Sequence, residues 1–251
     1  MDVLPHPANP DYGQAIYRRA IRLTNRPGET IGELEDSEHA LRARLVHDGA
    51  RVVALTAEFS RYPMTTCPNA NSLLAEFAGI PLDTPLAWFY GEGRPRRHCT
   101  HMHDLAWWMI SHARRTDTCR HYEIEVPDHP EGREVVARIR LDGEERLALT
   151  VRDDVVQAPR LYAGQNLFKR FVSWAIANLE GEELEAALML QKGYFVSLMH
   201  EIRPVPGPLA SFEQAFIGAC WSFNRPQFDV AARIDSHREF PGGEKLLKFS
   251  G

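Results

Sequence analysis

The sequence predicts an α+β fold in which antiparallel hairpins pack against helices. Asp-Gly pairs lie between strand-like segments twice, at Asp48-Gly49 and at Asp142-Gly143, and such a pair is a strong short-range signal of a hairpin. Amphipathic helical segments follow each hairpin. The chain has 251 residues, 44% hydrophobic and 25% charged, which is enough for one domain with a real core. We therefore expect residues 1–251 to form a single domain.

The strands are predicted from alternation of apolar and polar residues around the two Asp-Gly turns. Residues 1–14 are proline-rich and precede the first strand. The predicted strands are Tyr17–Thr24, His39–His47, Arg51–Phe59, His121–Val126, Val135–Leu141 and Arg146–Arg152.

The two hairpins also resemble each other. When the two Asp-Gly pairs are aligned, an offset of 94 residues, seven of fifteen positions are identical without a gap. This similarity predicts a duplicated strand–hairpin–helix unit, with pseudo-repeats over residues 15–115 and 120–200. The alternative is that two Asp-Gly hairpins share a generic β composition.

The helices are predicted from their ends and their apolar stripes. Pro68 suits the first turn of a helix that starts at Cys67, and Gly79 suits its end. Thr100 is the expected cap of a helix from His101 to about Arg115. The segments Leu167–Leu179 and Glu182–Met199 predict an antiparallel helical pair. In the tail beyond Pro204, at most one short helix is expected, around residues 212–221.

Charge and cysteine content restrict the partners and the compartment. A formal net charge of -5 argues against nucleic acid and anionic membranes as partners. No apolar segment approaches the length of a membrane span, and residues 1–10 do not resemble a signal peptide. The four cysteines form no CxxC pair, so reduced thiols and a cytoplasmic location are expected. A homodimer is the default expectation for such a protein.

Polar residues with chemical potential cluster in the first half of the chain. They are Asp36 with His39, His47-Asp48, the segment 61–68 and the segment 98–104. Cys67 is expected at a helix cap, where the helix field favours a thiolate or an anionic ligand. His101 and His103 fall in the first turn of the next helix, where the same field lowers a histidine pKa. Asp104 follows and can orient an imidazole.

The same segment allows a metal site as an alternative. His98, Cys99, His101, His103 and Asp104 are all competent donors. However, the sequence contains no HExxH or CxxC motif, and two histidines two residues apart on a helix point to different faces. Phosphate loops, GxGxxG and GxSxG are also absent from the sequence.

Several segments together resemble a bacterial family known as domain of unknown function 2889. They are LVHDGARV, RYPMTTCPNA, FAGIPL and HCTHMHDLAWW, in matching order, and the resemblance covers about residues 15–200. This chain has Met102 where the family typically has leucine. The resemblance is associated with bacterial degradation of lignin-derived aromatic compounds. It implies a cofactor-free lyase that cleaves phenylcoumaran-type dimers at a carbon–carbon bond and releases formaldehyde.

Such a lyase needs a base, a group that stabilises a phenolate, and apolar walls for two aromatic rings. The resemblance suggests His101 or His103 as the base, with Asp104 orienting it. Arg61 or Tyr62 would hold the phenolate. Further substrate contacts are expected from the residues Thr65, Cys67, Trp88, Phe89, Tyr90, Cys99 and Trp107. No cofactor is expected.

Two other functions stay open at this stage. One is a metal-dependent hydrolase or lyase that uses the segment His98–Asp104. The other is a non-catalytic protein that binds a hydrophobic ligand or a protein partner.

Overall fold

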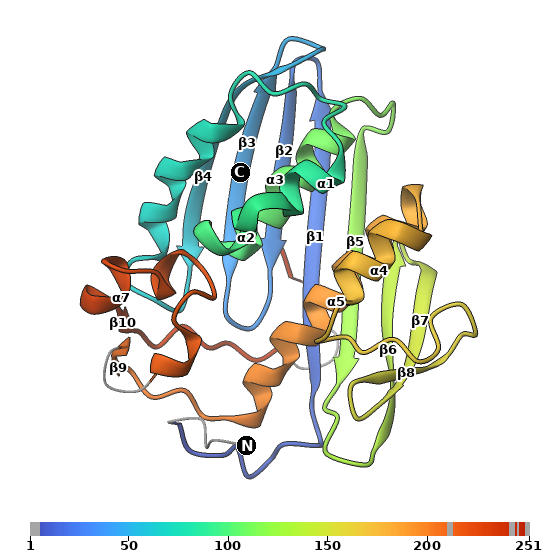
Figure 1. Cartoon of the computed structure of the whole chain (residues 1–251), viewed down its shortest axis with the longest axis vertical. Helices are drawn as coiled ribbons and strands as arrows, with labels where there is room; N and C mark the ends of the chain where they lie inside the picture. Colours follow the sequence, from blue (N-terminus) through green and yellow to red (C-terminus); the bar gives the residue numbers. More distant parts are fainter. Residues whose placement is uncertain (1–5, 210–212, 241–243, 245, 249–251) are drawn as a thin grey trace.

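A computed structural model describes residues 6–209, 213–240, 244 and 246–248 of the chain. Its centre is one antiparallel sheet of eight strands, in the order β4-β3-β2-β1-β5-β6-β7-β8 (Figure 1). The predicted α+β class is confirmed. The two hairpin-containing units are not separate sheets, because β1 and β5 pair along nine residues, from Ile16↔Pro127 to Thr24↔Cys119.

The structure extends most predicted strands by a few residues and adds two. The large sheet consists of β1 (Ile16–Arg26), β2 (Glu29–Glu35), β3 (Ala40–His47), β4 (Val52–Arg61), β5 (Cys119–Pro127), β6 (Glu134–Leu141), β7 (Glu144–Arg152) and β8 (Val155–Ala158). Strands β2 and β8 were not predicted. A small two-stranded sheet pairs β9 (Gly207–Pro208) with β10 (Ala232–Arg233).

The main helices cover one face of the sheet (Figure 1). Helix α3 packs against β2 and β3, and α5 packs against β5 and β6. The α-helices are α1 (Leu86–Tyr90), α2 (Arg94–Arg97), α3 (Thr100–His112), α4 (Phe171–Asn178), α5 (Gly181–Ser197) and α7 (Gln227–Val230). The 3-10 helices are η1 (Cys67–Phe77), η2 (Gly91–Gly93), η3 (Leu198–Glu201), η4 (Gln214–Phe216) and η5 (Trp221–Phe223).

Several predicted helix ends need correction. Cys99, not Thr100, is the cap residue of α3, and Thr66, not Cys67, is the cap residue of η1. The segment from Cys67 is a 3-10 helix, although Gly79 has the expected positive φ of 82°. The tail contains η4, η5 and α7 instead of one short helix, and residue 212 lies outside the described residues.

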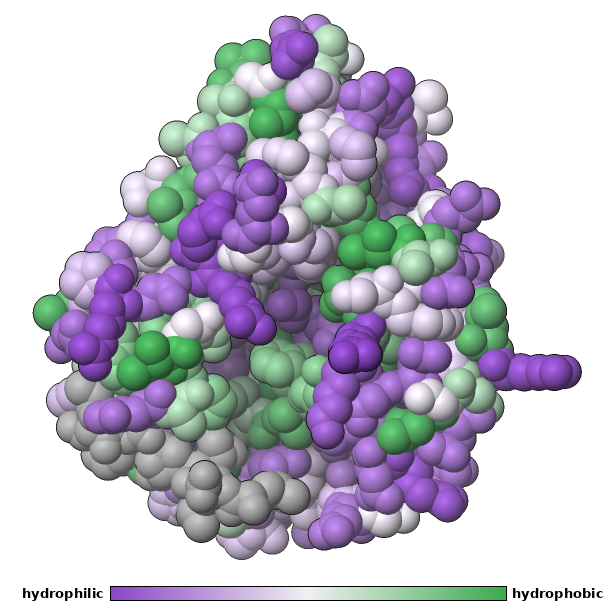
Figure 2. Space-filling model, viewed as in Figure 1, coloured by the Kyte–Doolittle hydropathy of each residue, from purple (hydrophilic) through white to green (hydrophobic). Residues whose placement is uncertain are grey.

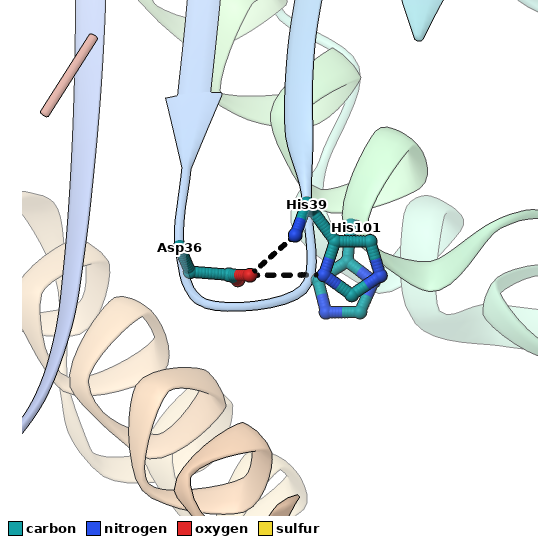
Figure 3. A group of neighbouring side chains, drawn as sticks. All are labelled: Asp36, His39 and His101. Carbon is teal, nitrogen blue, oxygen red and sulfur yellow. Dashed lines mark hydrogen bonds and ion pairs between the residues drawn. The ribbon is translucent and has the colours of Figure 1, made fainter. Parts of the chain in front are cut away.

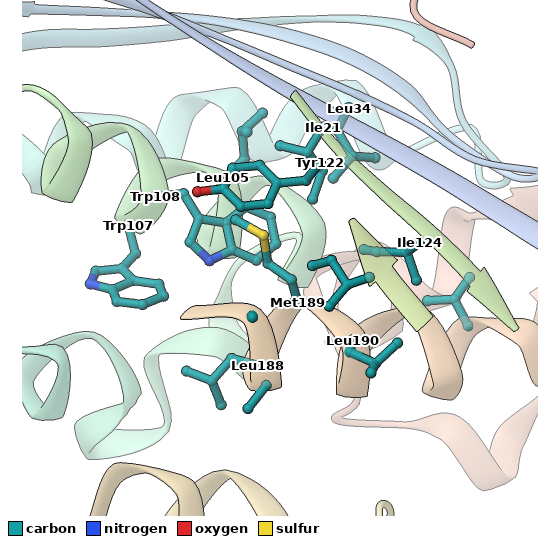
Figure 4. Packing of buried hydrophobic residues seen from close by; sticks show 14 of the residues in the cluster. Ile21, Leu34, Leu105, Trp107, Trp108, Tyr122, Ile124, Leu188, Met189 and Leu190 are labelled. Atoms are coloured by element: carbon teal, nitrogen blue, oxygen red, sulfur yellow. The ribbon is translucent and has the colours of Figure 1, made fainter. Parts of the chain in front are cut away.

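The core fills the space between the sheet and these helices (Figure 4). Trp107 and Trp108 point in different directions from α3, as expected for consecutive helical residues. Gly32 of β2 lets α3 approach closely, because a Cβ there would lie 2.5 Å from the Met109 sulfur. Gly193 of α5 plays the matching role against Ile124 of β5, at 2.6 Å.

The large sheet has antiparallel strands on both sides of β1. Strands β2-β3-β4 run outward on one side and β5-β6-β7 on the other. Each set is followed by a helix that packs on its first two strands, α3 in one half and α5 in the other. The 94-residue offset aligns β3 with β6. Because β2 and β5 both run antiparallel to β1 while α3 and α5 lie on the same face, the two sets are mirror images and do not superpose in the register of this offset. Duplication therefore stays a prediction.

The other face of the sheet carries charged side chains in ion pairs, such as Arg22 with Glu33 and Arg140 with Glu125. A C-terminal segment packs against Glu35, which accepts a hydrogen bond from the backbone N–H of Leu247. Among the described residues, no helix has both the length and the hydrophobicity needed to cross a membrane.

Candidate functional site

The turn between β2 and β3 holds a buried aspartate–histidine pair (Figure 3). Asp36 Oδ1 accepts hydrogen bonds from the backbone N–H groups of Glu38 and His39, at 2.9 and 2.8 Å. The same oxygen lies 3.0 Å from His39 Nδ1. A proton on Nδ1 satisfies this contact, which leaves Nε2 as the nitrogen that can accept a proton from another molecule.

His101 completes a three-residue cluster from the opposite side. It projects from the first turn of α3 and its ring lies against the His39 ring, with centroids 3.8 Å apart and planes tilted by 32° (Figure 3). The cluster therefore joins a strand turn to a helix start that is about sixty residues away in the chain. His101 was a predicted site residue, and the structure places it beside Asp36 and His39 rather than beside Asp104.

The side chains of Tyr17 and Arg19 contact the second carboxylate oxygen of Asp36. The Tyr17 hydroxyl donates to Asp36 Oδ2 at 3.0 Å, and an Arg19 nitrogen lies 3.5 Å from the same oxygen. Both Arg19 and Asp36 are fully buried. Burial alone would raise the pKa of Asp36, but attraction to His39, the hydrogen bond from His39 and the charge of Arg19 hold that pKa well below its usual value. Asp36 is therefore a permanent carboxylate.

The field around His101 keeps its ring neutral. Burial is the main cause that lowers the pKa of His101 well below the usual histidine value, and the charges of His39 and Arg19 lower it further. Its Nε2 is buried and makes no hydrogen bond with the described residues. The cluster thus combines one fixed negative charge with two imidazole rings in contact.

Arg61 binds the backbone of this turn. Its guanidinium donates to the carbonyl oxygens of Ser37, Asp36 and His39, at 2.7, 2.5 and 3.2 Å. The turn thus lies between Arg61 and His101, and Arg61 positions the turn instead of facing a cavity shared with His101. Arg61 was expected to hold a phenolate, but its guanidinium donates to backbone carbonyl oxygens of this turn.

His103 and Asp104 belong to a second buried network. The His103 ring packs among Phe77, Phe89, Tyr90 and His98, and neither ring nitrogen makes a hydrogen bond within the described part of the chain. This position makes it an unsuitable base.

Asp104 accepts a hydrogen bond from the Tyr90 hydroxyl at 2.9 Å and pairs with Lys192 of α5 at 3.1 Å. Burial raises its pKa, but the Lys192 charge and the contacts with His103 outweigh burial and lower it to about 2. Asp104 therefore pairs with Lys192 and does not orient His101, the predicted base.

The Asp104 pKa predicts an acid-sensitive contribution to stability. A carboxyl whose pKa falls from 3.8 unfolded to about 2 folded binds fewer protons in the folded state, so its contribution is present above pH 4 and is lost as the pH falls toward 2. That contribution is about 2 kcal/mol at neutral pH. Urea unfolding of the wild type and Asp104→Asn should show a difference that shrinks between pH 6 and pH 3. A difference independent of pH would contradict this assignment.

The other predicted substrate contacts do not converge on the cluster. The Trp88 ring stacks under the Arg94 guanidinium at 4.1 Å. Tyr62 packs edge-to-face on Phe59, and the Thr65 hydroxyl accepts a hydrogen bond from the backbone N–H of Ala232. Trp107 is 8% exposed and belongs to the core. Of this set, Tyr90 alone bonds to the Asp104–Lys192 pair.

Cys67 and Cys99 are not activated thiols. Burial raises the pKa of the Cys67 thiol to about 11, and burial also raises that of Cys99. The expected thiolate at a helix cap is therefore wrong, because the loss of hydration outweighs any field from a short 3-10 helix.

This burial predicts selective thiol labelling. Cys119 is exposed, whereas Cys67 and Cys99 are buried. Titration of the native chain with 5,5′-dithiobis(2-nitrobenzoate) at pH 8 should give one fast thiol, which Cys119→Ser should remove. A fast reaction at Cys67 or Cys99 would be inconsistent with the buried thiols.

Asp36, His39 and His101 also suit a metal by residue type. Among the described residues they form a group whose ligand atoms all lie within 4.8 Å of one another. The geometry does not fit, because imidazole lone pairs lie in the ring planes and a transition metal binds about 2.0–2.1 Å from each nitrogen. The two ring planes are tilted by 32° with centroids 3.8 Å apart, so they meet farther from the rings than a metal at that bond length can lie. Asp36 Oδ1 also accepts three contacts already.

The helical face of the molecule is hollowed near its middle, with hydrophilic side chains at the back of the hollow and hydrophobic ones on its lower wall (Figure 2). A separate open hollow of about 350 Å³ lies between α1 and α4. Its lining is mostly apolar and comprises Ala87, Tyr90, Gly91, Val172, Ser173 and Ile176. Tyr90 thus lies beside an apolar surface and donates to the carboxylate that holds Lys192.

Comparison with known proteins finds no family model that matches the chain and no curated protein that matches its sequence. The resemblance noted from the sequence segments therefore stays a prediction.

Proposed function

We propose that the protein is a cofactor-independent acid–base enzyme in which His39, oriented by Asp36, removes a proton from an aromatic small molecule. The observation that carries this proposal is the Asp36–His39 pair with His101 stacked on it. A histidine with one nitrogen bonded to a buried carboxylate and the other free to accept a proton is the arrangement of a general base. The base is His39 and not His101 or His103, because His39 alone among these three has such a partner.

The sequence resemblance supports a particular reaction, the cleavage of a phenylcoumaran-type dimer. His39 Nε2 takes the proton of the hydroxymethyl group, and the O–H electrons form the carbonyl of formaldehyde. The electrons of the breaking carbon–carbon bond form the stilbene double bond, and the furan carbon–oxygen bond breaks to leave a phenolate. The step is redox-neutral, so it needs no oxidant or reductant.

Lys192 is our candidate for stabilising the phenolate. Its side chain is 19% exposed, and its ammonium pairs with Asp104 through one contact, which leaves donors for a ligand. Its charge also contributes to the lowered pKa of His101, so the two groups are within electrostatic reach. A positive group near the developing charge is worth several kcal/mol when water is excluded.

Product analysis tests this proposal. Chain dialysed against a chelator and then incubated with phenylcoumaran-type dimers should give a stilbene and formaldehyde in equal amounts, identified by mass spectrometry and by trapping of the aldehyde. Loss of turnover on dialysis with recovery on adding a divalent metal would favour the metal-dependent alternative. Ligand-induced stabilisation without product would favour a binding protein.

A further inference from the structure

A second polar cluster lies on the far side of the same turn. His200 of η3 places Nδ1 2.9 Å from Asp128 Oδ1 and Nε2 3.4 Å from the Ser37 hydroxyl. Ser37 belongs to the β2–β3 turn, and Asp128 directly follows β5. The three residues thus come from three separate segments and meet in the order carboxylate, imidazole, hydroxyl. The 3.4 Å contact lies within the looser range of nucleophile–base pairs before substrate binds.

Asp128 is held as an orienting carboxylate. Its second oxygen, Oδ2, accepts hydrogen bonds from the backbone N–H groups of Gly13 and Ala15, at 2.9 and 3.0 Å. Burial raises its pKa, but the hydrogen bonds from His200 and from these two N–H groups outweigh burial and lower it. An ionised Asp128 keeps the His200 proton on Nδ1, so Nε2 is the acceptor that faces Ser37.

A cavity of about 190 Å³ borders this cluster at His200, and Ser37 lies behind His200, 2% exposed and outside the cavity lining. The lining includes His200, Ile202, Asn9, His237 and Glu239. The segment that carries His237 also contacts Ser37, because the Arg238 N–H donates to the Ser37 carbonyl oxygen at 2.9 Å. Arg61 donates to the same carbonyl at 2.7 Å, which places a permanent positive charge beside Ser37. The cavity has room for an acyl group of a few carbon atoms.

The chain contains a second buried serine–histidine contact, between Ser197 and His129, which serves as a comparison. Ser197 lies 3.2 Å from His129 Nε2, but the other His129 nitrogen faces the Tyr12 hydroxyl and no carboxylate. Without a carboxylate, nothing fixes the His129 proton and stabilises its cation. The Ser37–His200 contact differs from the Ser197–His129 contact because His200 is also bonded to a carboxylate, that of Asp128.

We propose that Ser37, His200 and Asp128 form a second catalytic site, a nucleophile–base–carboxylate triad for small carboxylic esters. The Ser37 oxygen attacks the ester carbonyl carbon while His200 Nε2 takes the hydroxyl proton. When the tetrahedral intermediate collapses, the ester carbon–oxygen bond breaks, the alcohol leaves with the proton from His200, and water then hydrolyses the acyl-serine by the same steps.

Diisopropyl fluorophosphate tests the proposal, because it phosphorylates an activated serine with loss of fluoride and needs no lyase reaction. We expect one adduct per chain, mapped by peptide mass spectrometry to Ser37 and absent in Ser37→Ala. Its rate should fall at least about 100-fold in His200→Gln and stay unchanged in Ser197→Ala. In the wild type, the rate should rise with pH as one histidine loses its proton, a measurement that needs no variant to fold. No adduct, an adduct on another residue, or a rate insensitive to both His200→Gln and pH would overturn the proposal.

Discussion

Replacing His39 by glutamine should lower kcat for the proposed lyase reaction by at least about 100-fold, which is the usual contribution of a general base. The reason is structural. His39 is the residue whose Nδ1 contacts the buried Asp36 carboxylate, so its Nε2 is oriented to take a proton from a substrate. Glutamine keeps a polar side chain of similar reach but cannot hold the proton. Steady-state kinetics with formaldehyde as the detected product measures the effect.

A matched control separates the base from a general effect of losing a histidine. His121 of β5 is half-buried and lies outside the cluster, so His121→Gln should keep wild-type kcat. If His39 only stabilises the fold through Asp36, the two measurements would give another result. In that case His39→Gln would lose thermal stability while the remaining folded protein kept its turnover number.

Asp36→Asn should have the largest combined effect, with loss of both activity and stability. An amide in place of the carboxylate no longer fixes the His39 tautomer, and the comparable change in a serine protease triad costs roughly 10⁴-fold in kcat. The substitution would also leave the buried Arg19 guanidinium without its counter-charge. Breaking a buried ion pair by removing one partner costs about 3–5 kcal/mol. Urea unfolding and initial rates measure the two losses separately.

A double variant separates those two losses. Asp36→Asn combined with Arg19→Met removes both charges, so most of the lost stability should return because no unpaired charge stays buried. Activity should not return, because His39 still lacks its carboxylate. Recovery of both properties together would mean that Asp36 serves only to neutralise Arg19.

The hairpins could be predicted because their information is local. Asp48-Gly49 and Asp142-Gly143 fix the turns, and strict alternation marks the strands beside them. Strand β2 was missed because three of its four outward residues are glutamates and its inward Gly32 has no side chain to add to the pattern. That glycine is required by the approach of α3, a tertiary constraint that no local pattern contains. Strand β8 is only four residues long.

The site was only half predictable for the same reason. His101 was selected for its place in the first turn of α3, and Asp36 with His39 was noted as a polar pair at a hairpin entry. Their pairing depends on how the helix packs against the turn, which the sequence pattern of neither segment contains.

Arg19 and Lys192 differ in how far the sequence marked them. Arg19 gave one clue, since it occupies a fully buried position of β1 between Tyr17 and Ile21, where an apolar residue is expected. Lys192 gave none, because one lysine on a helix looks like a solvent-exposed residue.

The proton positions on His39 test the central claim most directly. A long-range ¹H–¹⁵N spectrum of the histidine rings in the native chain, at a pH where the ring is neutral and assigned with His39→Gln, reports which ring nitrogen carries the proton. We expect the proton on Nδ1, toward Asp36, and an unprotonated Nε2. A proton on Nε2 of the neutral ring would contradict the assignment of His39 as the base.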